Sequence, residues 1–215
     1  MITRVVTDAP VAALTFDDGP HPEYTPRLLD LLDRFHVRAT FFMVGQAAHD
    51  HPELVKRAAS KHAIGNHSWD HPVFPQITGR DRRRQLRACA AAIAPYGSRL
   101  FRPPHGAQSR GSRLDAWLLG YRSVGWNVDA EDWLPREPDW MADRLLRDTR
   151  PGSIVLLHDA IFRSLQPVPQ YDRTPMLEAV SIFLERASDR LRFLTVPELL
   201  KHGVAATSDP RNSEP

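Results

Sequence analysis

The chain has 215 residues, of which 42% are hydrophobic and 25% charged, and its formal net charge at pH 7 is +2. This composition is typical of one globular domain and not of a disordered chain. The small net charge gives no indication of nucleic-acid binding. A single cysteine, Cys89, excludes an internal disulfide and a cysteine-rich zinc site, and we expect it to pack as a small core residue.

Short apolar runs alternate with amphipathic helical patterns along the chain. In chain order, the predicted strands are Val11–Phe16, Thr40–Val44, Ala63–Asn66, Leu100–Arg102, Ser123–Val128, Ile154–Leu157 and Phe193–Val196. The predicted helices are Pro26–Phe35, Pro52–Lys61, Arg80–Ala94, Ser112–Leu119, Trp140–Thr149 and Met176–Ala187. Nearly continuous apolar strands are typical of a sheet buried on both faces. Seven strands that alternate with helices, without a dinucleotide-binding fingerprint, favour a parallel β/α barrel over an open doubly wound sheet.

The two ends of the chain lack the pattern of a targeting or membrane segment. Residues 1–10 contain an acid and no long apolar run, unlike a signal peptide, and no stretch approaches membrane-spanning length. We therefore expect a cytoplasmic protein without a membrane span. Residues 1–10 are expected to form an N-terminal extension, residues 11–203 the folded domain, and the polar residues 204–215 a disordered tail.

Polar clusters follow or end five of the predicted strands. They are Asp17-Asp18, His67–His71, Arg102–Gly106, Asp129–Trp133 and His158-Asp159. In parallel β/α barrels, functional residues gather at the carboxyl ends of the strands, where neighbouring loops converge. Five clusters from separate strands are therefore expected to meet in one pocket.

The first two clusters together predict a metal site. Asp17 and Asp18 precede Gly19-Pro20, where a turn can direct both carboxylates to the pocket, one as a ligand and one as a base; alone, this motif is more often a surface turn. His67 and His71 are four residues apart, a spacing that on a helical turn places both imidazoles on one side. With a carboxylate they make a two-histidine, one-carboxylate set that leaves coordination positions open.

The later clusters contain candidates for proton transfer. Arginine forks onto carboxylates, so Arg102 is expected to orient a catalytic aspartate and keep it ionised, with a structural salt bridge as the alternative. His158 emerges from an apolar run and is either an acid at the pocket rim or a buried core histidine. A neighbouring carboxylate such as Asp132 would raise its pKa and let it act as an acid near neutrality. Asp159 is expected to point elsewhere.

With these five motifs in order, the sequence resembles the polysaccharide deacetylases, the carbohydrate esterase family four that includes the rhizobial chitooligosaccharide deacetylase. The resemblance covers Val11 to Gly203, the expected catalytic domain, and implies a distorted β/α barrel of about seven parallel strands. The roles that it implies are Asp18, His67 and His71 as metal ligands, Asp17 as base, Arg102 as the residue that tethers the base, His158 as general acid and Asp132 as the carboxylate that tunes the acid.

The resemblance also implies a set of residues around the substrate. These are Pro104, His105, Trp126, Trp133 and Leu156. Trp126 and Leu156 match positions that line a pocket for the acetyl methyl group, and His105 stands where many members carry tyrosine. Because the backbone N–H of His105 would still stabilise an oxyanion, the exchange bears on substrate preference. We also expect Trp133, Trp140 and the loop Phe162–Tyr171 to form a sugar-stacking rim.

The implied function is a hydrolase that removes N-acetyl groups from amino sugars in oligo- or polysaccharides, using one divalent ion. Two nitrogens and one oxygen fit zinc, with cobalt or nickel as alternatives. An O-acetyl xylan esterase of the same family would use the same residues. A metal phosphohydrolase would need a second metal ion and basic phosphate-binding groups, and a non-catalytic glycan-binding module would lack the base or a ligand. We expect a monomer whose partner is an acetylated glycan.

Overall fold

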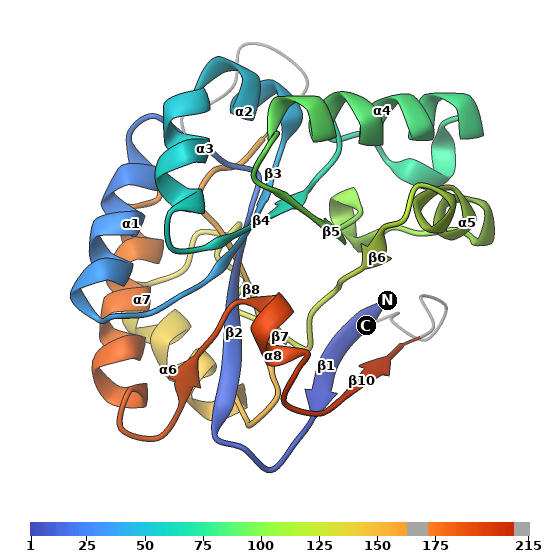
Figure 1. Ribbon diagram of the computed structural model, residues 1–215. Coiled ribbons are helices and arrows are strands. Elements are labelled where there is room, and N and C mark those ends of the chain that lie inside the picture. The colour runs from blue at the N-terminus through green and yellow to red at the C-terminus, as the bar shows by residue number, and fades with distance from the viewer. Residues whose placement is uncertain (163–171, 209–215) are drawn as a thin grey trace.

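The computed structural model of the protein describes residues 1–162 and 172–208. Its centre is a curled sheet of parallel strands in the order β6-β5-β4-β3-β2-β8-β7, with β9 paired to the start of β2 (Figure 1). The strands are β2 (Val11–Asp17), β3 (Thr40–Met43), β4 (Ala63–Asn66), β5 (Gly97–Phe101), β6 (Arg122–Ser123), β7 (Val128–Asp129), β8 (Ile154–His158) and β9 (Arg192–Phe193). The prediction of a distorted β/α barrel is confirmed.

Most of the helices cover the outer face of this sheet, whereas the last helix contributes its buried residues Val196 and Leu199 to the core inside the barrel. They are α1 (Tyr24–Arg34), α2 (Gly45–Asp50), α3 (Pro52–Ala59), α4 (Gly79–Ala92), α5 (Arg110–Leu118), α6 (Pro138–Asp148), α7 (Thr174–Ala187) and α8 (Val196–Leu199), with 3₁₀ turns η1 (Phe74–Gln76) and η2 (Pro104–Gly106). α1, α7 and α6 pack side by side against one side of the sheet, whereas α4 packs between α2 and α5 toward its β5–β6 end (Figure 1). Among the described residues, no helix combines the length and apolar character needed to cross a membrane.

Strand β2 shows how the apolar runs build the core. All seven of its residues are buried. Ala12, Leu14 and Phe16 belong to the cluster beneath the helices, while Val11 and Ala13 belong to a second cluster inside the barrel. Because side chains alternate along a strand, Asp17 follows Ala13 on the inner side, and the polar end of the strand is therefore directed to the mouth of the barrel.

The expectation of a disordered tail is wrong for its first four residues, which form a strand with residues of the expected N-terminal extension. Ile2–Val6 form β1, which pairs antiparallel with β10 (Val204–Thr207). Part of the predicted extension and the start of the predicted tail thus form one two-stranded ladder. Its Ile2 belongs to the inner core cluster and forms a bridge to Val124. Val5 is buried in the same cluster, and Ala205 packs against it. Residues 209–215 of the predicted tail lie outside the described part of the chain.

The other differences from the predicted elements are local. The predicted strand Ser123–Val128 is divided into β6 and β7, because Gly125 lies in a connecting stretch where its N–H donates to the carbonyl of Ile2 and not to a strand of the main sheet. Val196, placed at the end of a predicted strand, instead begins α8. The preceding Thr195 caps this helix through a reciprocal pair of hydrogen bonds with Glu198.

Candidate active site

Side chains from all five polar clusters line one pocket of about 430 Å³ at the carboxyl ends of the strands. The lining residues are Asp17, Asp18, His67, His71, His105, Gly106, Trp126, Asp129, Trp133, Leu156, His158, Ile161 and Phe162. Asp17 and His158 end the neighbouring strands β2 and β8 and are register partners. The expected convergence is therefore observed.

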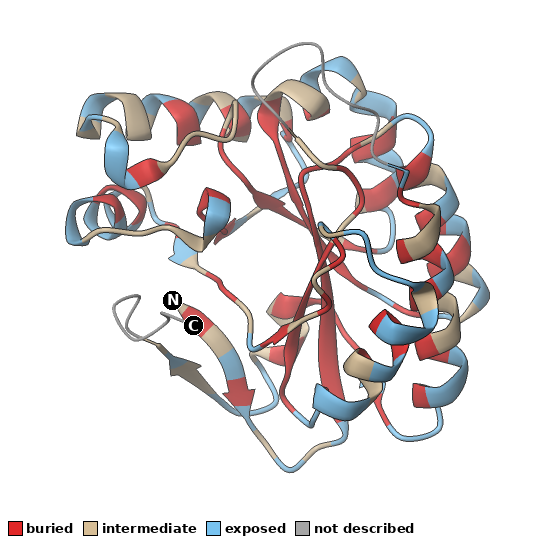
Figure 2. Ribbon diagram, turned by 180° about the vertical axis from the view of Figure 1, so that it is seen from behind, coloured by how far each residue is buried: buried red, intermediate tan, exposed pale blue. Residues whose placement is uncertain are grey.

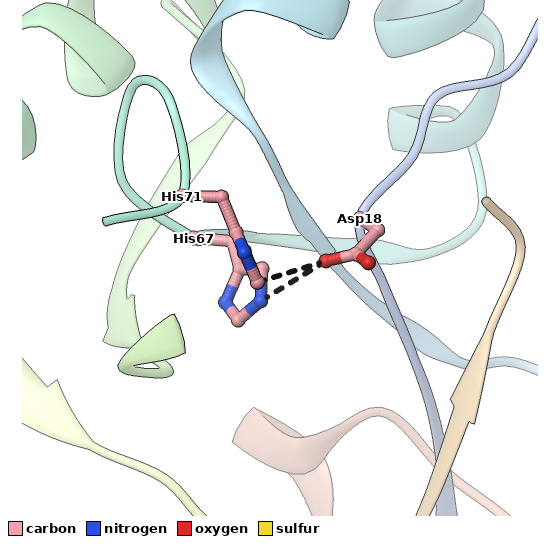
Figure 3. Close-up of side chains that lie close together, drawn as sticks. All are labelled: Asp18, His67 and His71. Atoms are coloured by element: carbon pink, nitrogen blue, oxygen red, sulfur yellow. Dashed lines mark ion pairs between the residues drawn. The ribbon is translucent and has the colours of Figure 1, made fainter. Parts of the chain in front are cut away.

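Asp18, His67 and His71 form a compact group in this pocket. The Nε2 atoms of His67 and His71 lie 3.3 Å and 3.2 Å from the same oxygen, Oδ1 of Asp18 (Figure 3). Two ligand atoms that each lie about 2 Å from one ion at the tetrahedral angle are separated by about 3.3 Å. The three side chains are thus spaced like ligands of a single cation, and within the described residues they are the one cluster of this kind.

The local backbone that brings the three ligands together differs from the expected helical turn. Residues 67–71 form an irregular loop, in which Ser68 and His71 have φ of 67° and 58°. Asp18 is also left-handed, with φ of 77°. These conformations are uncommon for residues other than glycine and concentrate at functional sites. The prediction that both histidines share one side is right, but positive-φ residues achieve it and not a helix.

The hydrogen bonds of Asp18 keep its Oδ1 available for a cation. The other oxygen, Oδ2, accepts from the backbone N–H of Phe162 at 3.0 Å, whereas the buried Oδ1 accepts no hydrogen bond from the described residues. Nδ1 of His67 lies 2.8 Å from the carbonyl of Arg102, so that Nε2 is directed to the pocket. Burial raises the pKa of Asp18, but the neighbouring His67 and His71 outweigh it and hold that pKa well below its usual value. An ionised carboxylate with an unsatisfied oxygen fits a metal site.

Asp17 is held from behind by the fully buried Arg102. Nη1 of Arg102 donates to Asp17 Oδ1 at 2.7 Å and to Thr15 Oγ1 at 2.8 Å. Its remaining donors go to the carbonyls of Val124 and Gly125. The expected two-nitrogen fork onto the carboxylate is therefore wrong, because barrel carbonyls take the other donors. As a result, Oδ2 of Asp17 has no contact with Arg102.

His158 belongs to a fully connected group with Asp132 and Arg173. Nδ1 of His158 lies 2.8 Å from Asp132 Oδ1, and the backbone N–H of His158 donates to Asp132 Oδ2 at 2.8 Å. Arg173 donates to Asp132 Oδ2 at 2.5 Å, to the Asp132 carbonyl at 2.8 Å and to the His158 carbonyl at 3.2 Å. Asp132 lies near His158, as expected. Arg173 was missed because its position before α7 carries no motif.

The charges of this group determine the protonation of His158. Burial lowers the pKa of His158, but the charge and hydrogen bond of Asp132 outweigh burial and raise the pKa to about 9. Burial likewise raises the pKa of Asp132, whereas His158 and Arg173 lower it below the usual value overall. The pair is thus an imidazolium and a carboxylate near neutrality, and Nε2 of His158 is left to face the pocket.

The expected substrate residues divide into those that line the pocket and one that does not. His105, Trp126, Leu156 and Trp133 all line it. Trp126 packs over Gly106, where a Cβ atom would lie 2.8 Å from the indole ring and where φ is 64°. Pro104, the first residue of η2, is buried and does not line the pocket, so a direct contact between Pro104 and the substrate is not supported.

The expected sugar-stacking rim is only partly present. Trp133 is 51% exposed at the pocket, but Trp140 lies on α6 outside it, where Arg136 and Arg144 stack on its ring. Phe162 lines the pocket, and the rest of the predicted rim, residues 163–171, lies outside the described residues. Asp129, which belongs to a predicted cluster but received no role, also lines the pocket, and burial raises its pKa.

Asp159 points away from the pocket, as expected. It is fully buried, and its Oδ2 accepts from the hydroxyl of Thr25. Burial raises the pKa of Asp159 to about 7. Cys89 is also buried, as expected. Neither residue contributes a group to the site.

Comparison with known proteins places this site in a family. The polysaccharide deacetylase family matches residues 4–124. A chitooligosaccharide deacetylase of Sinorhizobium fredii is 40% identical over 74% of this chain and 76% of its own length. A peptidoglycan-N-acetylglucosamine deacetylase of Bacillus cereus is 33% identical over 88% of this chain and 68% of its own. The chain therefore belongs to the polysaccharide deacetylase family.

Solved structures agree with this assignment. The crystal structure of the Bc1960 peptidoglycan N-acetylglucosamine deacetylase superimposes with a TM-score of 0.84 at 28% identity, covering 95% of this chain and 94% of that one. BA3943, a family pseudoenzyme from Bacillus anthracis, superimposes with a TM-score of 0.82 at 25% identity, covering 94% and 69%. The fold is thus shared by an enzyme and a pseudoenzyme, and activity has to be argued from the side chains.

Proposed function

We propose that this protein is a metal-dependent carbohydrate N-deacetylase that releases acetate from N-acetylated amino sugars. The observation that carries the proposal is the pocket in which Asp18, His67 and His71 leave one buried carboxylate oxygen unsatisfied between Asp17 and His158. A cation site beside one carboxylate and one imidazolium provides the groups needed for metal-assisted hydrolysis. The named functions of the relatives from Sinorhizobium fredii and Bacillus cereus support the same substrate class.

In this proposal, Asp17 is the base. Its Oδ1 is fixed by Arg102, and its Oδ2 takes a proton from a water molecule as the water oxygen bonds to the acetyl carbon. A divalent cation held by Asp18, His67 and His71 would, when bound, supply a Lewis acid for the amide carbonyl. The backbone N–H of His105 donates to the oxygen that gains negative charge in the tetrahedral intermediate.

His158 completes the reaction as the acid. When the carbon–nitrogen bond breaks, the amine nitrogen takes a proton from Nε2 of His158, and acetate leaves with the carbonyl carbon. Asp132 and Arg173 keep the imidazole oriented, because Nδ1 and the backbone of His158 are both held by them. Trp126 and Leu156 provide an apolar wall for the acetyl methyl group. We propose zinc as the native ion, since two imidazole nitrogens and one carboxylate oxygen suit it.

The alternatives are less well supported. A metal phosphohydrolase with two ions would require a second cluster of ligands, but the described residues contain only the cluster of Asp18, His67 and His71. A pseudoenzyme similar to BA3943 would be expected to lack a catalytic group, but Asp17, Asp18, His67, His71 and His158 are all present and converge. An O-acetyl xylan esterase would use the same groups and can be distinguished only by its substrate.

Substrate assays test the proposal directly. Acetate and free amine should be measured with N-acetylated chitooligosaccharides, peptidoglycan and acetylxylan as substrates. We expect equal amounts of acetate and amine from at least one N-acetylated substrate, and loss of both in the Asp17→Asn protein. Acetate from acetylxylan alone would contradict N-deacetylation and support the esterase. No product from any substrate by the metal-loaded protein would favour the non-catalytic module.

A further inference from the structure

Positive charge is concentrated in one segment of the chain, far more than the total suggests. Residues 79–123, called here the arginine-rich segment, contain ten arginines, no lysine and two aspartates, a formal net charge of +8 in a chain whose total is +2. Seven of these arginines are exposed: Arg80, Arg84, Arg87, Arg99, Arg110, Arg113 and Arg122. Another arginine of the segment, Arg102, is fully buried and binds Asp17 in the pocket. The rest of the chain is therefore acidic overall, and the charge is strongly asymmetric.

The two aspartates of the arginine-rich segment do not neutralise its surface. Asp115 is buried between α4 and α5, where Arg82 and Arg83 bind its carboxylate. Asp81 pairs with Arg84 at 3.2 Å. Arg82 and Arg83 therefore join the two helices. The excess charge is carried by the remaining exposed arginines.

Helix α5 adds an apolar face to this basic segment. Leu114, Trp117 and Leu118 are 54%, 69% and 60% exposed, and their spacing of three and four residues places them on one side of the helix. Arg110 lies one turn before Leu114, and Arg113 lies one turn before Trp117. The opposite side of α5 carries the buried Ser112, Asp115 and Ala116. The helix lies at the periphery of the molecule, away from the main helical layer (Figures 1 and 2).

We propose that α5, with Arg110 and Arg113 beside its apolar face, docks the protein on an anionic lipid bilayer. A helix with tryptophan and leucine on one face and arginine beside them suits the boundary between head groups and acyl chains. Each arginine near an anionic membrane surface contributes attraction. A second copy of this chain is a poor occupant, because its own +8 segment would be repelled. An acidic polymer would neutralise the arginines but would leave the apolar face of α5 in water.

Vesicle flotation tests the proposal and does not depend on deacetylase activity. The full chain should bind vesicles of phosphatidylglycerol and phosphatidylcholine, should bind pure phosphatidylcholine vesicles weakly or not at all, and should be released by salt. Trp117→Ser with Leu118→Ser should weaken binding about tenfold, since two apolar side chains no longer enter the interface. Arg110→Gln with Arg113→Gln should weaken binding by at least about fivefold, the factor that corresponds to ~1 kcal/mol for one arginine.

Matched variants outside the arginine-rich segment serve as controls. Val6→Ser with Val204→Ser removes two exposed apolar side chains, and Arg147→Gln with Arg190→Gln removes two exposed charges. Both controls should bind the anionic vesicles like the unaltered protein, and circular dichroism should confirm that every variant is folded. The proposal is overturned if the protein does not bind these vesicles, or if the α5 variants and the controls bind equally. Loss of binding with the arginines alone, together with equal binding of soluble polyphosphate, would indicate an acidic polymer and also overturn it.

Discussion

Two charged clusters meet at the pocket, and they differ in whether the protein donates hydrogen bonds to both oxygens of the central carboxylate. In the group of Asp132, His158 and Arg173, both oxygens of the carboxylate accept hydrogen bonds from charged or backbone donors. In the group of Asp18 and its two histidines, Oδ1 of the carboxylate is buried and accepts none from the described residues. Buried charges are stable when they are paired, so the second group is incomplete without a cation.

This difference is consistent with the separate roles that we propose for the two clusters. The satisfied group holds one imidazole in a fixed orientation and protonation state, as a proton donor requires. The unsatisfied group has three ligand atoms and open space in front of them, as a catalytic metal site requires. Removing the cation should therefore affect the two clusters unequally.

The largest expected effect is that of metal removal. A strong chelator should reduce deacetylation by about 10³-fold or more, because Lewis-acid stabilisation is worth several kcal/mol, and Zn²⁺ or Co²⁺ should restore it. His67→Ala and His71→Ala should also lower the bound metal measured by elemental analysis. The exposed His49→Ala is the matched control and should keep the metal. Full activity of a protein shown to be metal-free would refute the assignment of the cluster.

The next effect separates the neighbouring aspartates. Asp17→Asn should keep metal occupancy and lose about 10²–10⁴-fold in turnover, the usual contribution of a general base. Asp18→Asn should lose metal, because a neutral amide oxygen is a poorer ligand than a carboxylate. The measurements are elemental analysis and turnover on the same preparations. The opposite result, with metal lost from Asp17→Asn and kept in Asp18→Asn, would reverse the two roles.

The sequence predicted these two aspartates better than it predicted how they are held. The residue types and their positions at strand ends were enough to place Asp17, Asp18 and the histidines in one pocket, since parallel strands end at the same edge. The left-handed conformations of Ser68 and His71 were not predictable, because they depend on surrounding contacts and not on local propensity. The fold was predicted correctly, because the alternation of strands and helices is visible along the sequence. The pairing of β1 with β10 was not predicted, because it is a contact between the two chain ends.

A smaller and pH-dependent effect is expected at His158. The acid acts in its protonated form, so activity should fall as pH rises through the pKa of His158, which is about 9 in the metal-free protein and is lowered by a bound cation. NMR titration of the chelated protein should find this imidazole close to 9. In the His158→Gln protein the alkaline limb should disappear and amide hydrolysis should fall about 10²-fold. Hydrolysis of an aryl acetate should be spared, because its aryloxide leaves without protonation. An equal loss of activity on both substrates would contradict the role of His158 as acid.

The raised pKa of His158 also predicts that the stability of the folded state falls as the pH rises. In the unfolded chain the pKa of histidine is about 6.5, so the interaction of His158 with Asp132 stabilises the folded state fully below that pH. The contribution is lost as pH rises toward about 9. Denaturant unfolding of the chelated protein between these pH values should show the loss, and His158→Gln should reduce it.

The smallest expected effect concerns Arg173, which acts only through its neighbours. Arg173→Lys keeps the charge but cannot make the three hydrogen bonds to Asp132 and to the carbonyl of His158. Because the imidazole is then less well oriented, turnover should fall about tenfold, the lower end of the range for residues that position a catalytic group, while the KM and metal content stay unchanged. Arg136→Lys, at an exposed arginine paired with Glu131, is the matched control. If Arg173→Lys lowers metal content as much as turnover, Arg173 supports the whole pocket; if it slows aryl acetate as much as the amide, it does not act through His158.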